Sequence, residues 1–220
     1  MNELVPGFFQ LALFPRQSVN AYYADGVLFD TGVDAKGTKI LAALKDRPLT
    51  AIALTHGHSD HVGGAAGVCT ARGVPLWCPA AEADAVESGN LVSLVPQNLL
   101  ARLAPPKARP APVARRLQEG DDVAGFRVIA TPGHSPGHVS YWRERDGVLI
   151  LGDALFGLSL PLLIPGLHEP PAMLTTNPVQ NRASLRALRD LAPAVVVFGH
   201  GPPLTDAARF HQFIDRLPTP

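Results

Sequence analysis

The chain has 220 residues, of which 46% are hydrophobic, and its 19 basic residues balance 19 acidic ones. This size and composition predict one globular domain over residues 1–220, and the even spread of charge argues against a nucleic-acid partner. We find neither a signal peptide nor an apolar run of membrane-spanning length, so we expect a cytoplasmic protein that makes no membrane contact. The two cysteines, Cys69 and Cys78, lack a CxxC spacing and are expected to be buried free thiols.

The first half of the chain is predicted to mix short apolar strands with helices. Apolar runs between turn residues predict strands at residues 8–14, 19–24, 26–32, 50–54 and 75–78. Apolar residues at helical spacing predict helices at 38–45, 65–71 and 80–87, the second of them ending at Gly73. Residues 91–103 are ambiguous, and the four prolines of residues 104–112 indicate an exposed loop within the domain.

The second half of the chain shows the same mixture. Strands are expected at residues 115–119, 126–130, 139–143, 147–151 and 194–198, and helices after Asn177-Pro178 and over 205–217. Residues 155–176 show no periodicity and are predicted to be a loop or lid. A glycine, an apolar strand and an aspartate occur in order at 26–30 and again at 147–153, a hint of two related sheet halves.

Three histidines and one aspartate lie within six residues, directly after the predicted strand at 50–54. Zinc prefers imidazole nitrogen and carboxylate oxygen as ligands, at about 2.0–2.2 Å. His56 and His58 are two residues apart, so in an extended segment they point the same way and can bind one ion. Asp60 and His61 follow the turn and can bind a second ion. The alternative, a loop of solvated histidines, does not explain why three of the eight histidines gather here.

Three more candidate ligands are scattered along the sequence. His134, Asp153 and His200 each follow a predicted strand and each lies beside a glycine. In layered α/β folds such strand ends form the active crevice. A turn or capping role is the alternative for each of them alone, but the cluster at 56–61 favours one site assembled by the fold.

In combination these motifs resemble the metallo-β-lactamase-fold hydrolases. The shared pattern is His-x-His-x-Asp-His, Thr-Pro-Gly-His-x-x-Gly-His, Gly-Asp and Gly-His-Gly, and it covers residues 22–203. The resemblance implies an α/β fold, a four-layer αβ/βα sandwich, with two divalent metal ions at one edge of the sheets. Zinc is the first expectation for both ions, and iron or manganese are the alternatives. The resemblance also implies that His56, His58 and His134 hold one ion, that Asp60, His61 and His200 hold the other, and that Asp153 bridges them.

Within that family the filled Asp153 position is similar to glyoxalase II enzymes and lactonases. Antibiotic-hydrolysing lactamases usually have cysteine or serine near that place and carry export signals. Only 20 residues follow His200, so we expect no counterpart of the C-terminal helical domain of two-domain glyoxalase II enzymes.

The reaction implied by the resemblance is hydrolysis of a small-molecule thioester by a hydroxide that the two ions share, with Asp60 and Asp153 as its catalytic residues. The alternatives are a lactone hydrolase, a mono-iron persulfide dioxygenase and a metal-binding protein without catalysis. Whether the chain forms a homodimer is left open.

Several further residues receive weaker assignments. Asp30 is interpreted either as a second layer around the metal site or as a turn cap. His138 is expected to order a loop rather than to bind metal, His168 to be a solvated loop residue with substrate contact as the alternative, and His211 to lie at the surface. Tyr22, Phe156, Leu158 and Asn177 are candidate pocket residues.

Overall fold

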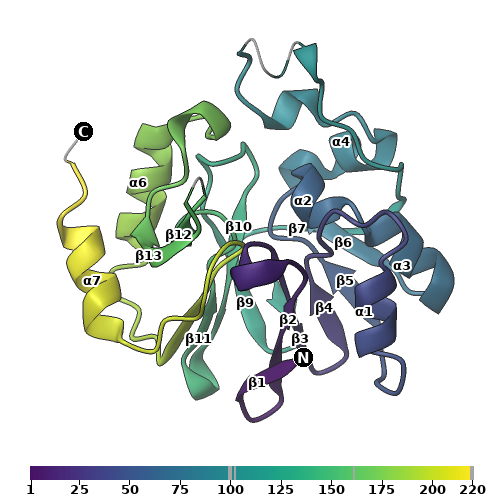
Figure 1. Cartoon of the computed structure of the whole chain (residues 1–220), viewed down its shortest axis with the longest axis horizontal. Coiled ribbons are helices and arrows are strands. Elements are labelled where there is room, and N and C mark those ends of the chain that lie inside the picture. The colour runs from purple at the N-terminus through teal and green to yellow at the C-terminus, as the bar shows by residue number, and fades with distance from the viewer. Residues whose placement is uncertain (99–100, 102, 161, 219–220) are drawn as a thin grey trace.

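Two β-sheets pack face to face in the computed structural model, which describes residues 1–98, 101, 103–160 and 162–218 (Figure 1). The first sheet has the spatial order of its sequence, and its members are β1 (Asn2–Val5), β2 (Phe8–Ala12), β3 (Asn20–Ala24), β4 (Val27–Phe29), β5 (Ala51–Ala53), β6 (Leu76–Pro79) and β7 (Val113–Leu117). Strands β1 to β4 pair antiparallel, and β4 to β7 pair parallel.

The second sheet has the order β14-β11-β10-β9-β8. Its strands are β8 (Asp122–Val123), β9 (Phe126–Ala130), β10 (Val139–Arg143), β11 (Val148–Ile150) and β14 (Val195–Val197). Only β11 and β14 pair parallel, and the other neighbours pair antiparallel. As a result β9, β11 and β14 run in the same direction, and their C-terminal ends share one edge of the sheet.

The side-chain alternation of the strands explains why the sheets have helices on both sides. In β4, Val27 and Phe29 enter the core between the sheets, where they meet Val148 and Ile150 of β11. Leu28 points to the opposite face, into a core that the first group of helices closes. A strand that is apolar on both faces needs cover on both, so each sheet is sandwiched between the other sheet and a helical layer.

The helices form the two outer layers (Figure 1). Among the residues that the structure describes, the first half of the chain contributes α1 (Thr38–Ala43), α2 (Ser59–Val62), α3 (Ala65–Arg72) and α4 (Ala83–Ser88), and the second half contributes α6 (Pro178–Ala187) and α7 (Ala207–Asp215). Asn177 and Asp206 cap the last two by accepting hydrogen bonds from the backbone N–H of Gln180 and Arg209. Short 3₁₀ turns occupy 15–17, 80–82, 92–94, 144–146 and 172–174. The predicted four-layer sandwich is therefore confirmed, and no described helix is long and apolar enough to cross a membrane.

Three details differ from the sequence-based prediction. Residues 155–176 are not one irregular lid, because they contain the hairpin β12 (Phe156–Ser159) and β13 (Ile164–His168). A register shift and Pro165 interrupt the alternation that would have revealed it. The short strands β1 and β8 were also missed. Of the ambiguous stretch 91–103, residues 92–94 form a turn, whereas 99, 100 and 102 lie outside the described residues.

Candidate metal centre

The seven predicted donors come together at one edge of the sandwich. His56, His58, Asp60 and His61 follow β5 in the first sheet. The other three donors, His134, Asp153 and His200, follow β9, β11 and β14, whose C-terminal ends share an edge of the second sheet. Three overlapping groups have donor atoms within 4.8 Å of one another, and the groups are His56–His58–His134, His56–His61–Asp153 and Asp60–His61–His200.

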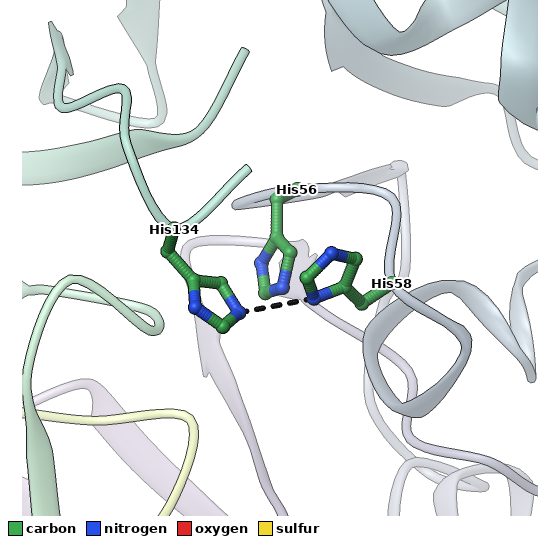
Figure 2. A group of neighbouring side chains, drawn as sticks. All are labelled: His56, His58 and His134. Atoms are coloured by element: carbon green, nitrogen blue, oxygen red, sulfur yellow. Dashed lines mark hydrogen bonds between the residues drawn. The ribbon is translucent and has the colours of Figure 1, made fainter. Parts of the chain in front are cut away.

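The first group consists of three imidazoles from two loops (Figure 2). His134 Nε2 lies 3.0 Å from His58 Nδ1, and the three rings pack edge to face. His56 is fully buried, and His58 and His134 are 9% and 2% exposed. Three nitrogen donors at this separation could hold one metal ion, and zinc commonly takes three protein ligands of this kind.

Asp153 lies between the first group and the third. Its Oδ2 is 3.5 Å from His134 Nε2, 3.4 Å from His61 Nε2 and 3.1 Å from His200 Nε2. His200 Nε2 also lies 3.3 Å from Asp60 Oδ2. One carboxylate oxygen therefore faces imidazoles of both groups.

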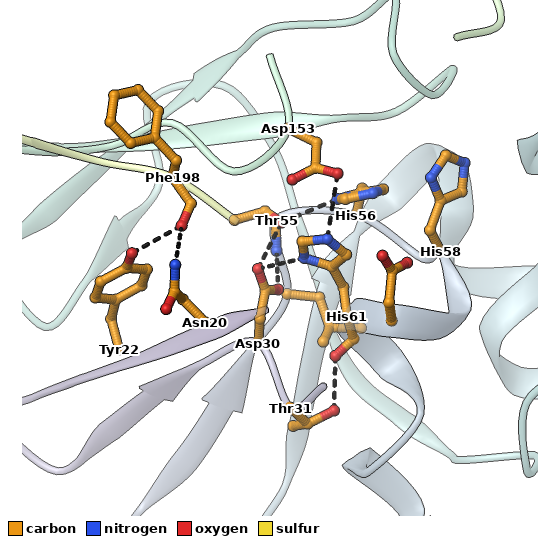
Figure 3. Close-up of polar contacts among 12 residues, drawn as sticks. Asn20, Tyr22, Asp30, Thr31, Thr55, His56, His58, His61, Asp153 and Phe198 are labelled. Atoms are coloured by element: carbon orange, nitrogen blue, oxygen red, sulfur yellow. Dashed lines mark hydrogen bonds and ion pairs between the residues drawn. The ribbon is translucent and has the colours of Figure 1, made fainter. Parts of the chain in front are cut away.

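Hydrogen bonds to the far side of the rings fix which nitrogen of His56 and His61 faces the site (Figure 3). His61 Nδ1 donates to Asp30 Oδ2 at 2.8 Å. Thr55 Oγ1 also donates to Asp30 Oδ2, so its lone pairs are left to accept from His56 Nδ1 at 3.0 Å. In its neutral form each of these rings therefore carries its lone pair on Nε2, which points into the cluster.

In each of the remaining three histidines one ring nitrogen likewise faces an acceptor outside the cluster, which leaves the other nitrogen to face the cluster. His58 Nε2 donates to the carbonyl of Leu94 at 2.8 Å, so its free lone pair is on Nδ1. His134 Nδ1 faces Thr175 Oγ1 at 3.4 Å, and His200 Nδ1 donates to the carbonyl of Ser18. Every imidazole of the cluster thus offers one nitrogen to the shared cavity.

Charge and burial make the cluster a fit for divalent cations. In the described part of the chain, His56 Nε2, His61 Nε2 and Asp153 Oδ1 are buried polar atoms without a hydrogen-bond partner, which is costly unless a ligand engages them. Burial, reinforced by neighbouring imidazoles, holds the pKa of His56 and of His134 well below its usual value, so both rings are neutral donors. Burial opposes ionisation of Asp153 as well, yet His200 and His61 hold its pKa well below the usual range.

The histidines beside aspartates behave in the opposite way. Burial lowers the pKa of His200, but Asp153 and Asp60 overcome it and raise that pKa to about 10. Asp153 and Asp30 similarly raise the pKa of His61 above its usual value despite burial. These nitrogens therefore lie where the protein favours positive charge, which a bound cation supplies.

His138 is close to the cluster but is not one of the seven donors. Its Nε2 accepts the backbone N–H of Asp153 at 2.9 Å, so its Nδ1 carries the proton and donates to Thr131 Oγ1 at 2.8 Å. Burial lowers the pKa of His138 to about 3, which keeps the ring neutral. With both nitrogens engaged it orders the Asp153 loop, in agreement with the prediction.

Asp30 belongs to the second layer of the site rather than to a simple turn cap. Its carboxylate accepts from His61 Nδ1 and from both the N–H and the hydroxyl of Thr55, each at 2.8 Å. Sequence reasoning missed the roles of Thr55 and of Asn20, whose side-chain amide donates to the carbonyls of Phe198 and Gly201 and so anchors the His200 loop. Neither residue type is diagnostic by itself.

Four of the weaker assignments are wrong or incomplete. Among the candidate pocket residues only Phe156 lines the described cavity at the site. Tyr22 lies below it and donates to the carbonyl of Phe198 at 2.7 Å, Leu158 is buried in the hairpin, and Asn177 caps α6. His168 is a half-buried strand residue outside the described lining, so it is neither solvated in a loop nor at the pocket.

His211 is half-buried rather than on the surface. Its Nε2 donates to the carbonyl of Leu191 at 2.9 Å. It therefore ties α7 to the segment that follows α6.

Comparison with known proteins agrees with this geometry. The model of the metallo-beta-lactamase superfamily matches residues 15–200. The chain belongs to the metallo-beta-lactamase superfamily. It is 32% identical over 201 residues to the probable metallo-hydrolase YflN of Bacillus subtilis, covering 81% of this chain and 76% of that protein.

A second relative carries a more specific name. The hydroxyacylglutathione hydrolase of Bdellovibrio bacteriovorus is 30% identical over 155 residues, covering 68% of this chain and 48% of that enzyme. The chain thus spans about half the length of that hydroxyacylglutathione hydrolase.

Two solved structures share the fold over nearly the whole chain. The B3 metallo-beta-lactamase BLEG-1 superposes with a TM-score of 0.72 at 31% identity, covering 96% of this chain and 98% of that one. The protein TTHA1623, in a di-iron-bound form, gives a TM-score of 0.70 at 31% identity, with 90% and 94% covered. Family and relatives together show a metal-dependent hydrolase.

Proposed function

We propose that this metallo-hydrolase cleaves a carboxylic thioester, with acyl thioesters of the hydroxyacylglutathione type as the first class to test. The observation that carries the proposal is the position of Asp153 Oδ2, 3.1 to 3.5 Å from imidazoles of both donor groups. In the proposed arrangement His56, His58 and His134 would hold one ion, Asp60, His61 and His200 would hold a second, and Asp153 would be a ligand common to both groups.

Zinc is the proposed metal because imidazole nitrogens and carboxylate oxygens are among its usual ligands. Iron is the competing candidate, since the similar protein TTHA1623 is described in a di-iron form. Two such ions, when bound, supply a nucleophile at neutral pH and polarise the carbonyl of the substrate.

The protein side chains around this chemistry supply orientation and exclude water. Asp60, about one-third exposed, is the donor that faces the cavity most openly and is placed to orient the attacking group. The ring of Phe156 packs edge-on against His200 and His134, at centroid distances of 4.6 and 6.2 Å. It restricts the motion of both imidazoles and keeps an apolar surface beside the scissile bond.

The cavity suggests what kind of substrate can bind. It has a volume of about 380 Å³, and five of the seven candidate metal ligands line it, namely His58, Asp60, His134, Asp153 and His200. Its described walls are mainly apolar, and they are formed by Val95, Pro96, Ala101, Ala104, Pro106, Phe156, Leu160, Met173 and Leu174. This arrangement suits an acyl group whose carbonyl lies beside these ligands while an apolar chain contacts the walls.

The thioester assignment draws on the hydroxyacylglutathione hydrolase relative, and it is tested with a substrate panel. The metal content of the purified protein is measured first. The protein is then assayed with lactoylglutathione, with N-acetylcysteamine thioesters of increasing acyl length, with lactones and with a β-lactam. We expect thioesters to give the highest kcat/KM, and lengthening the acyl chain to lower KM.

The metal arrangement is tested with Asp153→Ala, compared with Asp34→Ala as an exposed control. We expect Asp153→Ala to lose metal and most activity, and Asp34→Ala to keep both. Unchanged metal content and rate in Asp153→Ala would reject the shared-ligand role. Preferred lactone or β-lactam turnover would reassign the substrate. One iron with oxygen consumption on glutathione persulfide would indicate a dioxygenase, and bound metal without turnover a binding protein.

A further inference from the structure

A fully buried carboxylate, that of Glu82, connects the two loops that carry the three-histidine group. Its Oε2 accepts the backbone N–H of Gly57, the residue between His56 and His58, at 2.5 Å. Its Oε1 accepts the N–H of Gly137 at 2.8 Å and the hydroxyl of Ser135. The loop before α2 and the loop after β9 therefore both donate hydrogen bonds to the same side chain, although they follow strands of different sheets.

The glycines at the two contact points leave room for this carboxylate. A Cβ at Gly57 would lie 3.1 Å from Glu82 Oε2 and 2.6 Å from Leu94 Cδ1. A Cβ at Gly137 would lie 2.7 Å from Glu82 Cγ. Any larger residue would push the carboxylate away from one loop, so both positions are built around the approach of Glu82.

Burying a carboxylate is costly unless hydrogen bonds compensate it. Three donors from two loops do so here, and bonds to an ionised acceptor are stronger than neutral ones. The same bonds restrain the loops relative to each other, because neither can move without losing a bond to a buried charge. The distance most directly controlled in this way is that between His58 Nδ1 and His134 Nε2, which is 3.0 Å (Figure 2).

We propose that Glu82 is a positioning residue that sets the spacing of His56, His58 and His134 by holding their two loops together. The inference rests on the proposed metal-binding role of those histidines. It adds that the affinity of this site depends on a side chain that touches none of the ligands. The hydrogen bonds of Glu82 do not link the residues Asp60, His61 and His200 to one another. The metal affinity of that second site should therefore not depend on Glu82.

Glu82→Gln is the sharpest perturbation, because it keeps the shape of the side chain. A glutamine has one acceptor oxygen and one NH₂ group, so it cannot accept from Gly57 and from Gly137 at the same time. In either orientation of the amide, the backbone N–H of Gly57 or of Gly137 faces the NH₂ group instead of an oxygen. The loop that carries this N–H then loses its hydrogen bond to residue 82. Loss of such an outer contact costs about 10–100-fold in metal affinity, and we expect about tenfold because Glu82 acts through the backbone.

The experiment is a Co²⁺ titration of the metal-free protein, followed by its visible absorption, with chelator competition to give an affinity for each equivalent. Reference spectra of His134→Ala and His200→Ala assign the bands to the first or second site. In Glu82→Gln we expect the affinity of the three-histidine site to fall about tenfold and that of the other site to stay unchanged. Ser135→Ala, which removes a single hydrogen bond to Glu82, should lower the metal affinity of the three-histidine site by less than Glu82→Gln does.

Glu87→Gln is the matched control. It makes the same change within α4, the helix that begins directly after Glu82, but Glu87 contacts Arg116 and the N–H of Val113 instead of the two loops. Equal weakening of both sites in Glu82→Gln, in step with a lower unfolding midpoint, would mean a general structural role and overturn the inference. Unchanged metal affinity at both sites would also overturn the inference. If Glu82→Gln does not fold, Ser135→Ala decides by the same criterion. A wild-type protein that binds both ions but hydrolyses nothing would refute the proposed reaction and leave the role of Glu82 intact.

Discussion

Replacing Asp30 with asparagine tests how far the site depends on the residues behind its ligands. The Asp30 carboxylate accepts three hydrogen bonds of 2.8 Å, from His61 Nδ1 and from the N–H and hydroxyl of Thr55. The N–H of Thr55 bonds to one carboxylate oxygen, and the other two donors bond to the second oxygen. An amide has only one acceptor oxygen, so at least one buried donor must face an NH₂ group.

The expected size of the effect has two parts. An unsatisfied buried donor costs roughly 1–3 kcal/mol, which Asp30→Asn should lose from the free energy of unfolding of the metal-free protein. Loss of the carboxylate behind His61 should weaken metal binding at the Asp60–His61–His200 site by about 10–100-fold, or about 1.4–2.8 kcal/mol. Urea unfolding measures the loss of stability. Chelator competition, with an affinity determined for each equivalent of metal, measures the loss of metal binding.

The control for this substitution is Asp34→Asn, because Asp34 is an exposed acceptor for the N–H groups of Lys36 and Thr38. It should leave metal affinity unchanged. Equal affinities for wild type and Asp30→Asn at both sites would contradict the reasoning, since the orientation of His61 would then not depend on its hydrogen-bonded carboxylate.

Three further outcomes are expected. Phe156→Ala should lower kcat more than it raises KM for short substrates, because the ring restrains two imidazoles of the site; steady-state kinetics measure the split, and a pure KM effect would contradict it. Cys78 is buried as expected but Cys69 is only partly buried; burial raises the pKa of Cys69 to about 11 and that of Cys78 above its usual value, so native protein should react with a thiol reagent much more slowly than urea-unfolded protein. Leu185→Ala removes a fully buried side chain from the layer between α6 and the second sheet and should cost about 2–5 kcal/mol in urea unfolding.

The sequence predicted most of the fold because each strand carries a local signal. Apolar runs such as Ala51–Ala53 and Val195–Val197 are buried on both faces, and they read as strands without knowledge of their neighbours. The hairpin of residues 156–168 was missed, since its irregular pairing and its proline give no regular period. Strands β1 and β8 depend on a neighbouring strand more than on their own apolar content.

The site was predictable to the extent that function requires unusual residue types. Histidines and aspartates at strand ends stand out, and the structure brings all seven together. The supporting residues do not stand out. Glu82 lies in a stretch that reads as an ordinary surface helix, and its burial depends on two loops that are 25 and 53 residues away from it along the chain. No local pattern records such a contact, because the residues that need it are remote.

The arrangement of the donors links the metal centre to the packing of the two sheets. Strand β4 lies between an antiparallel and a parallel neighbour, and so does β11 in the second sheet, which supports the repeat hinted at by the sequence. Each of these strands is followed by an aspartate of the site, Asp30 and Asp153 respectively. Because the first sheet supplies His56, His58, Asp60 and His61 and the second supplies His134, Asp153 and His200, no ion can be fully coordinated unless both sheets are packed.

An ion that binds only the packed state stabilises that state in proportion to its affinity. Removing metal should therefore lower the unfolding midpoint of the whole sandwich rather than loosen only the loops. A metal-free protein that melts at the same temperature as the loaded one would contradict this reasoning, since the ion would then bind the unfolded chain as well as the packed sandwich, or neither.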